Sequence, residues 1–125
     1  MNRVPAAAAA YRAANIENAP PLKLVRMMYE GALRFLDQAD AGLADKDAAR
    51  FQERCLRASA VVGELRLALD HRQAPELAAS LDSLYDFCEG QLRRALLDES
   101  PAPLASVRDV LTTLLDGWRR LEVPA

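Results

Sequence analysis

Apolar residues recur at alternating intervals of three and four positions in four segments of the chain. On an α-helix this spacing brings them onto one face, and it is typical of the line along which helices pack together. The four stripes are Leu22, Val25, Tyr29, Ala32, Leu36, Ala39 and Leu43; Phe51, Cys55, Ala58, Val62, Leu65 and Leu69; Leu77, Leu81, Leu84, Cys88, Leu92 and Ala95; and Leu104, Val107, Leu111, Leu114, Trp118 and Leu121. We therefore expect helices over residues 21–43, 47–70, 75–97 and 101–121.

Helix starts and short connections favour one arrangement of these segments. Pro21 and Pro101 suit the first turn of a helix, where the missing N–H has no partner to lose. Asp45 or Asp47 is expected to cap the second helix, and Ser100 the fourth. Short links force consecutive helices to run antiparallel. The sequence therefore predicts an all-α fold, an antiparallel up-down-up-down four-helix bundle.

The chain has 125 residues, which is enough for one domain with its own core. We assign residues 20–122 to this domain. Residues 1–19 are alanine-rich and carry no sustained stripe, so we expect a mobile N-terminal tail, with or without a short extra helix. The run of five alanines after Pro5 is too short for a signal-peptide core. No segment approaches the roughly 20 apolar residues of a membrane span, so we expect a cytosolic protein.

Charge and cysteine content limit the classes of partner and of compartment. The formal net charge is -2, and the arginines are interleaved with acids rather than gathered in a basic stripe, which argues against nucleic-acid binding. Cys55 and Cys88 are far apart in sequence and form no C-x-x-C pair. We interpret them as buried thiols, with a disulfide between helices as the alternative.

We find no set of residues that would support catalysis. His71 is the only histidine, and it lies near the expected end of the second helix, where the helix dipole favours it. A di-iron site in a bundle needs inward-facing carboxylates and E-x-x-H pairs, whereas the stripes here are apolar. We therefore expect no enzyme activity, no metal and no cofactor.

The chain has more apolar residues than four packing stripes require. Leu33, Val61, Leu96, Val110 and Leu115 are expected to thicken the core. Leu24, Met28, Tyr29 and Phe35 together span a wider arc than one helix face. A contiguous exposed apolar patch usually marks a partner site, and a groove between two helices accepts an amphipathic helix. We therefore interpret the chain as a helical binding module, and the N-terminal tail is a candidate to cover its groove when no partner is present.

Several short motifs together resemble the flagellar secretion chaperone FliS family. The segment AYRAANIENAPPLKLVRMMYEGALRFLDQA holds a tail tyrosine, Tyr11, followed by Asn15 and Ile16, then a helix start and a Met-Tyr-Glu-Gly-Ala motif. The later segment LDSLYDFCEGQLRRA is similar to a Leu-Tyr-Asp-Phe motif of that family. Pro20 stands where that family usually has serine, which removes a good N-cap before Pro21, and Glu30 replaces the usual aspartate.

The resemblance implies a cytoplasmic chaperone that binds the C-terminal segment of flagellin, which is disordered before assembly. Binding would order this segment as helices, prevent premature polymerisation and assist delivery to the flagellar export gate, with other flagellar regulators as further partners. The residues expected to contact flagellin are Tyr11, Ile16, Leu24, Met28, Tyr29, Phe35, Tyr85 and Phe87. For Tyr29 and Phe87, packing in the core is the alternative. A homodimeric bundle that pairs its apolar surface with itself is the rival hypothesis, and the expected state is a monomer or a weak homodimer.

Overall fold

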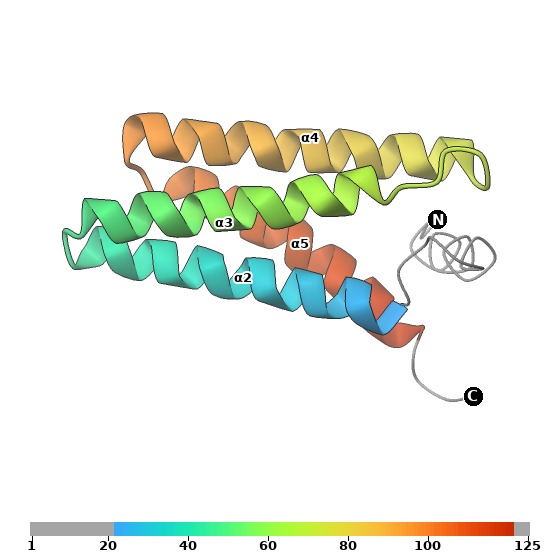
Figure 1. The fold of residues 1–125 in the computed structure, drawn as a ribbon, viewed down its shortest axis with the longest axis horizontal. Coiled ribbons are helices and arrows are strands. Elements are labelled where there is room, and N and C mark those ends of the chain that lie inside the picture. Colours follow the sequence, from blue (N-terminus) through green and yellow to red (C-terminus); the bar gives the residue numbers. More distant parts are fainter. Residues whose placement is uncertain (1–21, 122–125) are drawn as a thin grey trace.

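A computed structural model describes residues 22–121 as an antiparallel bundle (Figure 1). Its helices are α2 (Leu22–Ala44), α3 (Ala48–Leu67), α4 (Pro75–Asp98) and α5 (Ala102–Arg120). Consecutive helices run in opposite directions, so the α2–α3 turn and the α4–α5 connection lie at the same end of the molecule (Figure 1). The predicted up-down-up-down four-helix bundle is confirmed. Tyr11 and Ile16 lie outside the described residues.

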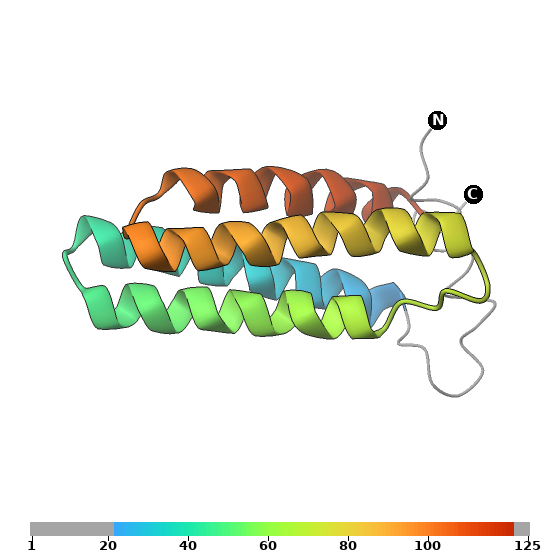
Figure 2. The same cartoon turned by 90° about the horizontal axis from the view of Figure 1, so that it is seen from above.

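Each helix packs against two neighbours and lies diagonally across from the third. Helix α2 contacts α3 and α5, and α4 contacts the same two helices from the other side (Figure 2). The core between them is built from the predicted stripes, and no polar or charged residue within 22–121 is buried in it. The residues predicted to thicken the core do so. Leu115 is buried, and four half-buried residues pack against the core: Leu33, Val61, Leu96 and Val110.

The predicted core register of α4 is wrong at one position. Leu84 was assigned to the stripe, but it is 36% exposed, whereas the neighbouring Tyr85 is fully buried. A step of three or four residues from Leu81 keeps either side chain near the core face. Tyr85 takes the inner position because its ring fills the bundle centre and its hydroxyl finds a buried partner, Tyr29.

Side-chain and backbone hydrogen bonds explain where the helices begin and end. Asp47 caps α3, because its carboxylate accepts the backbone N–H of Arg50 at 3.1 Å. Helix α3 ends at Leu67, three residues before the predicted end at Asp70. There the carboxylate of Asp70 accepts the backbone N–H of Arg72 at 2.9 Å and forms a turn instead.

The start of α5 also differs slightly from the expectation. The residue at the N-cap is Pro101, which has no side chain that can accept a hydrogen bond, and Ala102 is the first helical residue. Ser100, the predicted cap, lies one position further out. Its hydroxyl still accepts the backbone N–H of Ala102, at 3.4 Å. The capping interaction therefore forms with a weaker geometry than a serine at the N-cap would give.

Candidate partner-binding site

Each helix flanks its core stripe with two different kinds of residue. The following flank of a helix holds the residues that directly follow core residues in sequence. The preceding flank holds the residues that directly precede core residues. Around the bundle, following flanks meet following flanks at the α2–α5 and α3–α4 interfaces, as the ion pairs described below show. Preceding flanks must then meet at the α2–α3 and α4–α5 interfaces.

Charged side chains close the two interfaces where following flanks meet. Between α2 and α5, Arg108 binds Asp37 at 3.0 Å and Asp40 at 2.6 Å. Further along the same interface, Arg119 binds Glu30 at 2.9 Å. We call this interface and its α3–α4 counterpart the ion-paired seams.

The α3–α4 seam is organised around one guanidinium. Arg66 binds Asp82 at 2.6 Å, Asp86 at 3.2 Å and Glu89 at 3.7 Å. The hydrogen bonds from Arg66 hold the pKa of Asp82 below its ordinary value, and they raise the pKa of Arg66 in return. Both groups therefore stay charged over the whole physiological pH range.

The α2–α3 interface has apolar residues in the place of ion pairs. On α2 the preceding flank carries Leu24, Met28, Gly31 and Phe35, and Leu24 is 44% exposed while Met28 and Phe35 are half-buried. On α3 the facing residues include Arg57, whose guanidinium lies 5.9 Å from the centre of the Phe35 ring. Within residues 22–121, no ion pair links helix α2 with helix α3.

The α4–α5 interface is also apolar at its surface, and it carries no charge along its centre. Leu84 is 36% exposed and Phe87 is 45% exposed on α4. The other members along the centre of these two preceding flanks are small or uncharged: Ser80 and Gln91 on α4, and Ser106, Val110, Thr113 and Gly117 on α5. The charged members of the α4 flank, Glu76 and Arg94, lie toward the two ends of that helix. We call the α2–α3 and α4–α5 interfaces the apolar seams. They lie on opposite sides of the bundle, because the helices follow one another around it in chain order (Figure 2).

Two of the predicted contact residues lie in the bundle centre. Tyr29 and Tyr85 are fully buried, and their hydroxyl oxygens are 2.5 Å apart, so that one hydrogen bond crosses the diagonal between α2 and α4. The Tyr29 ring also lies 6.3 Å from the ring of Trp118 on α5. Tyr29 therefore packs in the core, which was the alternative interpretation of this residue. Tyr85 is likewise a core residue rather than a surface contact, because its ring fills the bundle centre and its hydroxyl hydrogen-bonds to Tyr29.

The other predicted residues within the described range lie at the surface. Leu24, Met28 and Phe35 share the α2–α3 seam, and Phe87 lies in the α4–α5 seam on the opposite face. Sequence reasoning missed Leu84 and Arg57 as seam residues. The signal for Arg57 is the antiparallel pairing of α2 and α3 about their short turn, which places it opposite Phe35. Leu84 could have been found only from the register of α4.

The rest of the described chain offers little for chemistry. Residues 22–121 hold no cluster of three or more histidine, cysteine or acidic side chains that could bind a metal ion. Burial raises the pKa of Cys55 to about 11 and that of Cys88 to about 12, so both thiols stay protonated at neutral pH. They form no disulfide. No helix in the described part is both long and apolar enough to cross a membrane.

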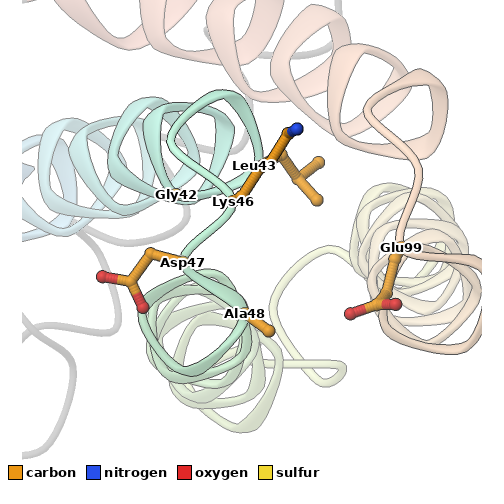
Figure 3. A pocket seen from close by; sticks show the side chains of 6 residues that line it. All are labelled: Gly42, Leu43, Lys46, Asp47, Ala48 and Glu99. Atoms are coloured by element: carbon orange, nitrogen blue, oxygen red, sulfur yellow. The ribbon is translucent and has the colours of Figure 1, made fainter.

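A pocket of about 250 Å³ lies at the end of the bundle where the two short connections meet (Figure 3). Its lining residues are Gly42, Leu43, Lys46, Asp47, Ala48 and Glu99. Lys46 and Glu99 come from different connections, and both adopt left-handed backbone conformations. The carboxylate of Asp47 already caps α3. The lining includes no nucleophile paired with a base, so the pocket gives no indication of catalysis.

Comparison with known proteins agrees with a flagellar role. A sequence model of the family described as flagellar protein FliS matches residues 3–124. The flagellar secretion chaperone FliS of Bacillus subtilis is 29% identical over 111 residues, which is 89% of this chain and 82% of that protein. The protein of the same name from Campylobacter jejuni is 32% identical over 101 residues, covering 81% of this chain and 79% of its own length. Its counterpart in Vibrio cholerae is 27% identical over 116 residues, or 90% and 85% of the two chains. The family match spans nearly the whole chain, and on this ground the chain belongs to the FliS family of flagellar proteins.

Proposed function

We propose that this protein is a cytosolic export chaperone that binds the C-terminal segment of flagellin as helices in the two apolar seams. The observation that supports this most directly is the surplus of apolar surface. The bundle has a complete core, yet Leu24, Leu84 and Phe87 remain exposed along interfaces that no other helix of the bundle covers. Apolar patches of this kind favour association with a partner.

The seams have the apolar chemistry that a helical partner requires. An amphipathic helix lying along two neighbouring helices can place its apolar residues between them at i, i+3, i+4 and i+7. Met28 offers a flexible, polarisable surface that adapts to different side chains. A segment bound in this way would be unable to pair with other flagellin molecules, which would prevent premature polymerisation and keep it available for the export apparatus.

Coupled folding sets the size of interface that such a chaperone needs. Ordering a disordered segment costs conformational entropy, so affinity depends on burying a long stretch of apolar surface. One seam along a single pair of helices is short for this purpose. We therefore propose that the flagellin segment uses both apolar seams.

Titration of the purified protein with the C-terminal segment of flagellin from the same organism tests this function. We expect one-to-one binding with a gain of helix in circular dichroism and a negative heat-capacity change in calorimetry. Leu24→Asp and Phe87→Asp should each weaken binding, because each places a carboxylate in an apolar seam. Leu56→Asp is the matched control, since Leu56 is 58% exposed but lies on the following flank of α3.

Three results would count against the flagellin assignment. The first is an absence of binding at concentrations on the order of tens of micromolar, which corresponds to a very weak complex for a chaperone. The second is an equal effect of all three substitutions, because that would separate binding from the apolar seams. The third is a concentration-dependent increase in the mass of the protein alone that Leu24→Asp abolishes, which would favour the homodimeric bundle instead.

A further inference from the structure

The two apolar seams differ in charge. Along the α4–α5 seam the central positions between Ser80 and Gln91 and between Ser106 and Gly117 carry no charged preceding-flank residue. The corresponding positions of the α2–α3 seam bring arginines next to Phe35. A partner helix that fits one seam would therefore not be equally suited to the other, although both are apolar.

Three guanidinium groups border the centre of the α2–α3 seam, and two of them share a single carboxylate, that of Glu53. Arg57 lies over the Phe35 ring and binds Glu53 at 3.1 Å. Arg54, on the same flank of α3, also binds Glu53, and its Nε atom is buried without a hydrogen-bond partner in the described part of the chain. One acid therefore serves two arginines. The other acid of this flank, Glu64, lies two turns further along α3, so the charge next to Phe35 stays positive.

Arg34 adds a third cation from the α2 side. Its side chain is exposed and forms no ion pair with any residue in the range 22–121. One of its terminal nitrogens lies 3.7 Å from the position that a Cβ atom would occupy on Gly31, so the guanidinium folds back over this glycine. Gly31 belongs to the preceding flank of α2, and the guanidinium of Arg34 therefore lies at the border of the seam.

We propose that the α2–α3 seam selects an acidic amphipathic helix, one whose apolar anchors are bordered on both sides by glutamate or aspartate. The anchors would lie against Leu24, Met28 and Phe35. Carboxylates on one border would reach Arg34, and those on the other would reach Arg54 and Arg57. This inference rests on the proposed function in assigning the helix to part of the flagellin C-terminal segment, and it adds the charge that this part must carry.

The preference runs against the overall charge of the protein. The formal net charge is -2, so long-range attraction would favour a basic peptide over an acidic one. Selection of an acidic helix must then arise locally, from the arginines at the seam. This opposition makes the charge preference a sharp test.

Two synthetic model peptides test the inference without flagellin. Both are amphipathic helices with leucine at i, i+3, i+4 and i+7; one has glutamate at the bordering positions and the other has lysine. Calorimetry at low ionic strength should give tighter binding of the glutamate peptide, by about tenfold, with a difference that shrinks as salt screens the charges.

A single substitution and a closely matched control locate the effect. Arg34→Glu should remove most of the preference for the glutamate peptide, and because Arg34 is exposed and unpaired this change should leave the fold intact. Arg93→Glu is the control. Arg93 is also exposed, and its guanidinium lies 3.7 Å from the corresponding position over Gly90, but it projects from α4 away from both apolar seams. Arg57→Glu provides a second variant on the α3 border of the seam.

The inference is overturned if both peptides bind equally, if the lysine peptide binds more tightly, or if neither binds. It is also overturned if Arg93→Glu reduces the preference as much as Arg34→Glu does. Self-association of the protein that Arg34→Glu abolishes would assign the seam to a second copy of the chain and contradict the proposal. Because flagellin is absent from this experiment, its failure leaves the flagellin titration to be judged independently.

Discussion

At the residue scale, the most informative contact is the hydrogen bond between Tyr29 and Tyr85. It joins the two helices α2 and α4, which lie diagonally across the bundle and make no direct backbone contact. Two hydroxyls are thereby buried together, and neither has to be desolvated without compensation. The pair therefore fixes the register of two helices that apolar packing alone would leave less well specified.

Tyr29→Phe and Tyr85→Phe should each lower the free energy of unfolding by about 0.5–1.5 kcal/mol, because each removes the same hydrogen bond. The double variant should lose clearly less than the sum of the two single losses, since the bond can be removed only once. Urea denaturation of the four proteins in a double-mutant cycle measures this coupling. Strict additivity, to within about 0.3 kcal/mol, would mean that the two hydroxyls are energetically independent.

The sequence pattern identified most of the core positions correctly, but it could not decide which of two adjacent apolar residues faces the core. Leu81 is followed by candidates for the core at both 84 and 85, since a step of three or four residues is equally compatible with a helix. The choice depends on Tyr29, which is 56 positions away from Tyr85 in sequence. Leu24, Met28 and Phe35 were identifiable because they exceed what one stripe can hold. Arg57 was not, because its role depends on the antiparallel register of two helices.

At the element scale, the α2–α3 hairpin depends on a glycine at the point of closest approach. A Cβ atom on Gly42 would lie 2.8 Å from the backbone nitrogen of Phe51 and 3.2 Å from the carbonyl oxygen of Asp47. Both neighbours are backbone atoms, which cannot move away as a flexible side chain can. The start of α3 would therefore have to shift as a whole.

Gly42→Ala should destabilise the protein by about 1–3 kcal/mol, the usual cost of forcing an extra group into a packed interface. Gly63→Ala is the matched control in the adjoining helix, because nothing lies within 4 Å of its Cβ position. Alanine there should stabilise the protein by about 0.5–1 kcal/mol, since it lowers the conformational entropy of the unfolded chain. Thermal and urea unfolding measure both. Similar effects of the two substitutions would contradict the close approach at Gly42.

The ion-paired seam between α3 and α4 should make the free energy of unfolding depend on pH in the acid range. Arg66 lowers the pKa of Asp82 below its ordinary value of 3.8 in the folded state, whereas the unfolded state keeps the ordinary value. The contribution of this pair is therefore present above the unfolded-state pKa and is lost as the pH falls through the folded-state pKa.

Urea denaturation between about pH 5 and about pH 2 should show a shallower loss of stability for Asp82→Asn than for the unaltered protein. At neutral pH the same variant should be the less stable of the two, because Arg66 loses its nearest carboxylate. Asp109→Asn is the control, since Asp109 is exposed and forms no ion pair with other described residues. Parallel acid profiles for the unaltered protein and Asp82→Asn would show that this pair contributes no acid dependence.

At the scale of the whole molecule, ion-paired and apolar seams alternate around the bundle. The ion-paired seams join α2 to α5 and α3 to α4, while the apolar seams lie between the pairs on opposite faces. The charged seams add specific contacts between neighbouring helices. The outer residues of the apolar seams, such as Leu24, Leu84 and Phe87, can remain exposed because the core beneath them is complete. The periodicity of the sequence predicted the bundle, but this alternation follows only from which flanks meet.

The placement of the apolar seams on opposite faces limits how one flagellin segment can occupy both. Two helices side by side span about 20 Å, so the chain between two bound helices needs at least roughly six to eight extended residues to cross the end of the bundle. Linking the two helices turns the second binding step into an intramolecular one, which can raise affinity by about 10²–10⁴-fold over either helix alone. We therefore expect the intact segment to bind one-to-one and far more tightly than either half-segment alone. Leu24→Asp should weaken the binding of one half-segment only, and Phe87→Asp should weaken the binding of the other only. Calorimetry with the intact segment and with each half measures this, and a half-segment that binds as tightly as the whole would show that a single seam is sufficient.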